Sequence, residues 1–149
     1  MKTYIKVSLL LALAFFLSGC QAQPQKFYYV KITTDASSYR VGDDVFVTIE
    51  NLSEGPIVLE SCKGLNKKYT LEKFEDGTWI VAYVSGCDIL DREYINIEAQ
   101  ERKSLFFTLV VDPNRVSTIQ GQYRLRFPIS ASQTLRDEYK ISNTFEVIQ

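Results

Sequence analysis

The clearest strand signal in this chain is Gly-Gln-Tyr-Arg-Leu-Arg-Phe at residues 121–127. Tyr123, Leu125 and Phe127 alternate there with one glutamine and two arginines. Because successive side chains of a strand point to opposite faces, this stretch predicts a strand with one buried and one polar face. Residues 45–50, Val-Phe-Val-Thr-Ile-Glu, show the same period and predict a second strand of this kind.

A hairpin is expected between residues 68 and 84. Two β-prone stretches, 68–74 and 78–84, are joined by Glu75-Asp76-Gly77. Both central residues of a type I′ turn need positive φ, which Asp-Gly accommodates, so Asp76 and Gly77 are expected to form the turn.

The remaining chain also shows strand patterns bounded by turn residues. Strands are expected at 27–34, 57–62, 103–111 and 139–148, and turns at 51–56, 112–114 and 134–137. Residues 37–43 form a connection with Gly42 and Asp43 at its turn, and residues 85–100 lack a strong period. About eight strands with no amphipathic helix predict an all-β fold, an immunoglobulin-like sandwich of about 7–8 antiparallel strands. A closed barrel is the alternative.

Three motifs bring the chain close to a known family. Residues 39–51 hold a Tyr-x-x-Gly-Asp turn leading into a strand that ends in Asn, residues 71–79 hold an acidic-Gly hairpin followed by Trp79, and residues 121–125 read Gly-x-Tyr-Arg-Leu. In this order they resemble bacterial Ig-like domains over nearly all of residues 27–149. The resemblance implies a β-sandwich outside the cytoplasm, with Tyr123 as a tyrosine corner whose hydroxyl bonds back to the preceding connection.

Aromatic residues make up 13% of the chain. We expect most of them, including Trp79, Tyr123, Phe127 and Phe145, to face the core. Those on the opposite phase, Phe46, Tyr28 and Phe106, are candidates for an exposed patch where a partner docks.

The N-terminus reads as a secretion leader. Two lysines precede an apolar stretch at residues 7–17, which is shorter than the roughly 20 residues that span a membrane. Leu-Ser-Gly-Cys at 17–20 resembles the lipobox of bacterial lipoproteins, which implies cleavage of 1–19 and lipid on Cys20. Residues 20–26 would then be a lipidated linker and 27–149 the domain. An ordinary secretory signal that happens to contain a cysteine is the alternative.

Lipidation of Cys20 would leave an even number of cysteines for disulfide formation. Of three cysteines, Cys20 would carry lipid, leaving Cys62 and Cys87. An exported pair can persist as a disulfide in an oxidising compartment, and two free thiols are the alternative. Because Cys87 follows the hairpin and does not lie in the Tyr123 strand, the bond would staple an edge or loop and not the centre of the core.

The composition argues against several classes of function. The chain has no histidine, which removes histidine-based nucleophilic systems and the commonest transition-metal ligand. The leader holds two of the 17 basic residues and none of the 18 acidic ones, so the mature chain is net negative and nucleic acid is not an expected partner. The acidic clusters at 43–44, 75–76 and 88–93 are interpreted as solvated turns. A carboxylate enzyme or a calcium site at Asp88 and Asp91 is the less favoured hypothesis.

These observations predict a non-catalytic binding or structural module with no cofactor and no metal. Lipid on Cys20 would hold it to a membrane of the cell envelope, where a protein partner is expected. Gln21 after the cysteine resembles proteins sent to the outer membrane, if the host has two membranes. The alternative is an inhibitor or immunity protein that blocks an envelope hydrolase through residues 85–100.

Overall fold

The computed structural model describes residues 29–63, 68–87, 89–131 and 138–149. They form a β-sandwich, as the sequence predicts. The elements in chain order are β1 Val30–Thr34, β2 Ser38–Arg40, β3 Asp44–Asn51, β4 Ile57–Cys62, β5 Tyr69–Glu75, β6 Thr78–Ser85, the 3₁₀ turn η1 Ile89–Asp91, β7 Arg92–Ile97, β8 Arg102–Thr108, β9 Gly121–Ser130, β10 Glu138–Ile141 and β11 Phe145–Ile148.

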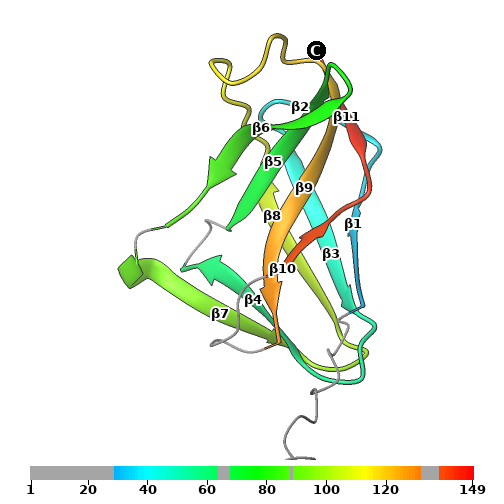
Figure 1. The fold of residues 1–149 in the computed structure, drawn as a ribbon, viewed down its shortest axis with the longest axis vertical. Helices are drawn as coiled ribbons and strands as arrows, with labels where there is room; N and C mark the ends of the chain where they lie inside the picture. The colour runs from blue at the N-terminus through cyan, green and yellow to red at the C-terminus, as the bar shows by residue number, and fades with distance from the viewer. Residues whose placement is uncertain (1–28, 64–67, 88, 132–137) are drawn as a thin grey trace, which may run out of the picture.

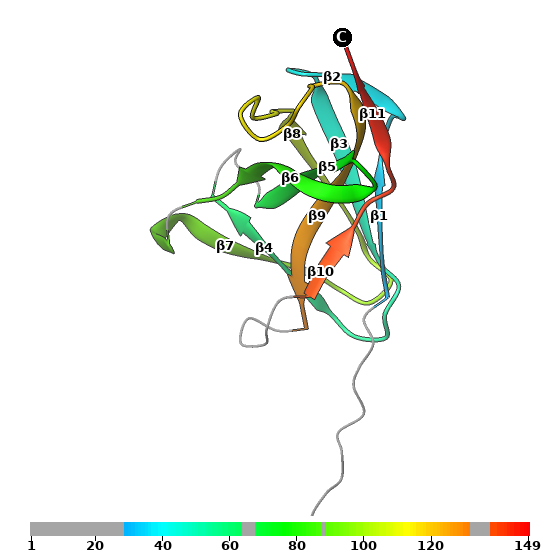
Figure 2. The ribbon, with the colours of Figure 1, turned by 45° about the horizontal axis from the view of Figure 1, so that its top comes forward.

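The two sheets differ in size (Figure 1). The small sheet has the antiparallel order β1-β3-β8. The large sheet is built around β9, which pairs with β11 and β10 along one edge and with β5 and β4 along the other. Beyond these, β2 pairs with β11 in parallel, β6 with β5, and β7 with β4. The β5–β6 and β4–β7 pairs diverge from β9 (Figure 2).

The core lies between the sheets and uses the predicted alternation. In β3 the side chains of Val45, Val47 and Ile49 are buried, whereas Phe46 points out. In β9 Leu125 and Phe127 face them from the other sheet within the same core cluster. Burial of these apolar side chains is the main term that holds the two layers together.

Three elements differ from the sequence expectation. Residues 92–97, expected to be irregular, form β7, whose pattern is weak because it is an outer strand beyond β4. The connection at 37–43 contains the short strand β2. The last strand is split into β10 and β11, because Ser142 Oγ accepts a hydrogen bond from Leu125 N (3.0 Å) in place of a strand carbonyl.

Other boundaries shift slightly or lie outside the described residues. β1 is seen from Val30, and the expected strand start at 27–28 and turn at 134–137 lie outside the described residues. The strand expected at 103–111 ends at Thr108. Within the described ranges, no helix is long and apolar enough to cross a membrane.

Candidate functional site

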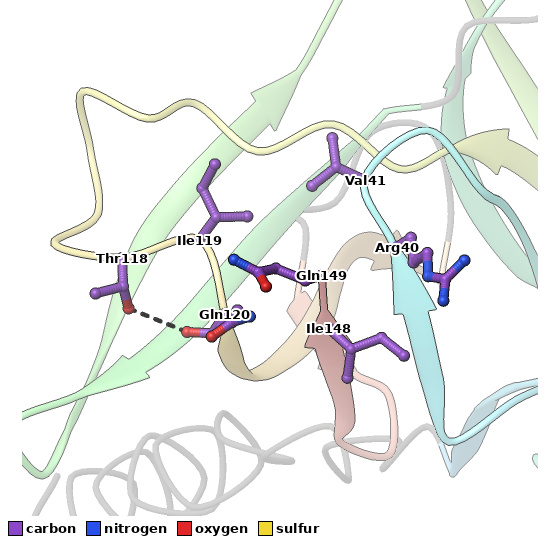
Figure 3. Close-up of a pocket in the computed structure, with 7 residues that line it drawn as sticks. All are labelled: Arg40, Val41, Thr118, Ile119, Gln120, Ile148 and Gln149. Atoms are coloured by element: carbon purple, nitrogen blue, oxygen red, sulfur yellow. Dashed lines mark hydrogen bonds between the residues drawn. The ribbon is translucent and has the colours of Figure 1, made fainter.

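A pocket of about 580 Å³ opens at one end of the sandwich (Figure 3). This end carries the C-terminus and lies opposite the start of β1 (Figure 1). The turn between β2 and β3, the loop before β9 and the end of β11 supply its walls. The lining residues are Arg40, Val41, Thr118, Ile119, Gln120, Ile148 and Gln149.

The pocket combines apolar walls with polar groups at its rim. Val41, Ile119 and Ile148 are each more than 40% exposed, so three aliphatic side chains meet solvent at one place. The Arg40 side chain, at the rim, forms no ion pair with the described part of the chain. Apolar walls with a few polar groups are the usual make-up of a binding site for a ligand or a partner's side chain.

A buried lysine holds the loop wall of this pocket. Lys73 points inward from β5 and is only 3% exposed. Its ammonium donates to the carbonyl of Thr118 (2.5 Å), to Thr118 Oγ1 (2.8 Å) and to Glu75 Oε1 (2.5 Å). Glu75 in turn accepts from Ser117 N (3.1 Å) and Ser117 Oγ (2.9 Å). The hydrogen bond from Lys73 lowers the pKa of Glu75, so the carboxylate stays ionised.

Tyr123 fixes the same loop one residue further along. Its hydroxyl donates to the carbonyl of Ile119 (2.6 Å), four residues upstream, which is the geometry of a tyrosine corner. Burial raises the pKa of Tyr123 to about 12. Gly121, between Ile119 and Tyr123, has φ +137°, and a Cβ at this position would lie 3.0 Å from Lys73 Cε. Only glycine therefore fits where the loop passes over the lysine.

The opposite wall is a tight turn. Asp43 Oδ2 accepts from Arg40 N (2.7 Å), and Asp43 N donates to Arg40 O (3.0 Å). Gly42 has φ +95° and donates its N–H to the carbonyl of Leu109 (3.0 Å), the residue that follows β8. These bonds hold Val41 at the tip of the turn.

The outer face of the large sheet carries a second cluster. Trp79 lies against Phe74 (ring centroids 5.2 Å apart) and beneath the guanidinium of Arg124 (4.2 Å). Glu72 pairs with Arg124 (2.7 Å) and with Arg126 (3.2 Å). The expectation that Trp79 faces the core is wrong. Trp79 lies opposite Phe74, which shares the outward phase of Glu72. The neighbouring cross-strand pair, Lys73 and Ile80, has the inward phase. The cluster's charges are already paired, so we interpret it as structural.

The predicted Cys62–Cys87 disulfide is present, with the Cα atoms 5.6 Å apart. Cys62 ends β4 and Cys87 follows β6, so the bond joins the two strand pairs that diverge from β9. It staples the periphery of the fold, as the cysteine positions indicated.

The described residues hold no cluster of His, Cys, Asp and Glu that could bind a metal ion. Asp43 caps a turn and Glu75 binds Lys73. Asp88, one of the two residues considered for calcium, lies outside the described residues.

The sequence pattern that defines the bacterial Ig-like domain matches residues 27–146. This chain belongs to that family. Ig-like domains of this family are generally non-catalytic and occur in extracellular or envelope proteins. No curated protein gives a significant match to the chain.

Similar solved structures are distant. An alkylpurine DNA glycosylase of Pseudomonas fluorescens shares 13% identity at a TM-score of 0.40, over 79% of this chain and 30% of that one. A β-glucosidase of Listeria innocua shares 17% identity at a TM-score of 0.37, over 81% of this chain and 16% of that one. A β-glucosidase of Erythrobacter marinus shares 11% identity at a TM-score of 0.32, over 78% of this chain and 15% of that one. The Ig-like chain thus spans under a third of each of these proteins.

The residues singled out by sequence fall into two groups in this Ig-like domain. Gly42, Asp43 and Tyr123 support the two walls of the pocket. Asp76 and Gly77, with φ of 49° and 80°, form the β5–β6 turn, next to Trp79 on the large sheet. Cys20 lies outside the described residues.

The pocket itself was not anticipated. Two of its aliphatic residues sit singly in polar segments, Val41 between Arg40 and Gly42 and Ile119 between Thr118 and Gln120, and they form no periodic pattern. The signal available in the sequence was an aliphatic residue flanked by turn residues. Lys73 could also have been recognised, because it shares the inward phase of Tyr69 and Leu71 and is therefore expected to be buried.

Proposed function

We propose that this protein is a lipid-anchored, non-catalytic binding module of the bacterial cell envelope, which contacts a protein partner through the pocket end of the sandwich. The observation that carries the proposal is that the three exposed aliphatic side chains, Val41, Ile119 and Ile148, surround one pocket with both its loop walls held by hydrogen bonds. A surface fixed before binding loses less conformational entropy when the partner arrives.

The position of the pocket suits an anchor on Cys20. The stretch from Cys20 to Val30 spans at most about 35 Å when fully extended. β1 starts at the end of the sandwich opposite the pocket (Figure 1). Lipid on Cys20 would therefore keep the start of β1 near the bilayer and leave the pocket facing away from it. Two or three acyl chains suffice for stable anchoring.

Capture from the solubilised envelope tests this proposal. The full chain in detergent is the bait, and the pocket variant combines Arg40→Glu with Ile119→Asp. The control, Lys31→Glu, makes the same charge reversal at an exposed position of β1. We expect at least one envelope protein to be enriched by the wild type and the control and lost with the pocket variant. Equal recovery by all three baits would refute the assignment.

One observation favours the inhibitor function as a second candidate. Leu90 is 86% exposed at the tip of η1. Lys63 holds this tip, because its N–H donates to Asp91 O (2.8 Å) and its Nζ to Leu90 O (3.2 Å), and the disulfide at Cys87 precedes it. An exposed apolar side chain held in this way resembles the contact residue of an inhibitory loop. Of the loop expected at 85–100, residues 92–97 form β7, and Leu90 lies just before that strand. Inhibition of an envelope hydrolase that Leu90→Asp left unchanged would exclude this role.

A further inference from the structure

The strand β8 ends the small sheet and leaves one backbone edge unpaired. It pairs with β3 alone among the strands of the described ranges. Residues 101 and 109 exchange backbone hydrogen bonds with the β3 side, so the odd-numbered residues face β3. The N–H and C=O groups of Arg102, Ser104, Phe106 and Thr108 therefore point outward, where an additional strand would meet them.

An aromatic pair lies beside this edge. Phe46 of β3 and Phe106 of β8 are direct cross-strand neighbours with ring centroids 5.9 Å apart. They are 52% and 47% exposed. Open edges are normally protected by charged residues, bulges or a covering segment. Here the charged residues of β8, Arg102 and Lys103, occupy only its first two positions, and the part next to Phe46 has none.

We propose that β8 accepts an extended segment of a partner protein as a fourth, antiparallel strand of the small sheet. Backbone hydrogen bonds along the outward groups would supply affinity, and an apolar side chain resting on Phe106 and Phe46 would supply specificity. Four residues later in the partner strand, the position opposite Arg102 suits a carboxylate. The Arg102 side chain is 70% exposed and binds Glu50 Oε1 through Nε (2.8 Å) and Nη2 (2.6 Å), which leaves Nη1 for the partner.

A second copy of this chain is a poorer occupant. β8 runs in the same direction as β1, because both are antiparallel to β3. An antiparallel pair of β8 strands would place the two β1 starts at opposite ends of the dimer, which conflicts with the proposed anchoring of both copies to one membrane. A parallel pair would set Arg102 and Lys103 of the two copies side by side, where like charges repel.

A synthetic peptide tests the proposal on the full chain in detergent. The probe is Thr-Val-Phe-Val-Thr-Thr-Glu, capped at both ends and fluorescently labelled, which places Phe opposite Phe106 and Glu opposite Arg102. A scrambled peptide of the same composition is the control, and binding is followed by fluorescence anisotropy.

The decisive variant is Ser104→Pro. It removes an outward N–H and blocks the edge, but leaves the hydrogen bonds of Lys103 and Leu105 to β3 intact. Its matched control, Ser104→Ala, keeps the N–H. We expect the ordered peptide to bind the wild type and Ser104→Ala alike, and Ser104→Pro at least about tenfold more weakly. Phe106→Ala should also weaken binding, whereas Phe74→Ala, at an exposed aromatic of the large sheet, should not.

Three results would overturn the proposal: no saturable binding up to about 1 mM peptide, equal binding by Ser104→Pro and Ser104→Ala in variants with unchanged melting temperature, or a solution dimer that Ser104→Pro dissociates. None of these bears on the pocket, so the proposed function stands or falls separately.

Discussion

Reducing the Cys62–Cys87 bond should lower the free energy of unfolding by about 3.5 kcal/mol. The two cysteines are separated by 25 residues, and for a closed loop of that length the chain-entropy relation gives a stabilisation of about 3.5 kcal/mol at 25 °C. A domain of this size is stable by only about 5–15 kcal/mol in total. The bond therefore supplies a large share of the margin that keeps the β4–β7 and β5–β6 pairs in place.

Urea denaturation with and without reductant, followed by Trp79 fluorescence, measures this effect. With a slope of about 1.5 kcal/mol per molar urea, the loss corresponds to a midpoint lower by about 2 M. The control is the double variant Cys62→Ser, Cys87→Ser, which should start near the reduced wild type and show no response to reductant. Equal midpoints for oxidised and reduced wild type, at equal slopes, would contradict the reasoning.

Three further predictions concern other parts of the molecule. Tyr123→Phe removes the hydrogen bond to Ile119 and should lower the free energy of unfolding by about 1 kcal/mol, which corresponds to a few degrees in melting temperature. The control Tyr139→Phe, at an exposed tyrosine, should have no measurable effect. Equal shifts of the two variants in calorimetry would refute the tyrosine corner. Burial raises the pKa of Tyr69 as well as that of Tyr123 above the ordinary value of 10.0, so the unfolded state loses these two protons first. The contribution of these tyrosines to stability should therefore be fully present below about pH 10 and be lost as the pH rises towards about 12. Denaturation midpoints that stay level from pH 9 to 12 would argue against this. Cys20→Ala should move the protein from the membrane to the soluble fraction on cell fractionation, and continued membrane retention would disprove the anchor.

Local sequence pattern was sufficient for much of the sandwich. The alternation in β3 and β9 and the Asp76-Gly77 turn each depend on local chemistry, and each appears where the sequence indicates. β7 was missed because only Ile95 and Ile97 mark its inward face, and its remaining residues are polar or exposed. The division of the last strand depends on a contact between Ser142 and Leu125, which are 17 residues apart, and local pattern does not encode it.

The candidate site was accessible to sequence reasoning only in part. Gly42, Asp43 and Tyr123 were recognised as structural motifs, but that they support two walls of one pocket depends on the packing of the β2–β3 turn against the loop before β9. Trp79 was placed on the wrong face because its aromatic character outweighed its phase. Its partner Phe74 lies in the same phase as Glu72, and that phase faces outward.

Photo-crosslinking from the pocket in living cells would identify what binds this end of the sandwich. A photoreactive amino acid placed at Ile119 of the full-length protein, in its native envelope, reports what touches this surface. We expect a discrete protein adduct that disappears with Arg40→Glu. A photoreactive group at Lys31, near the other end of the sandwich, should not form this adduct. An adduct from Lys31 but none from Ile119 would contradict the claim that the pocket end is the binding surface.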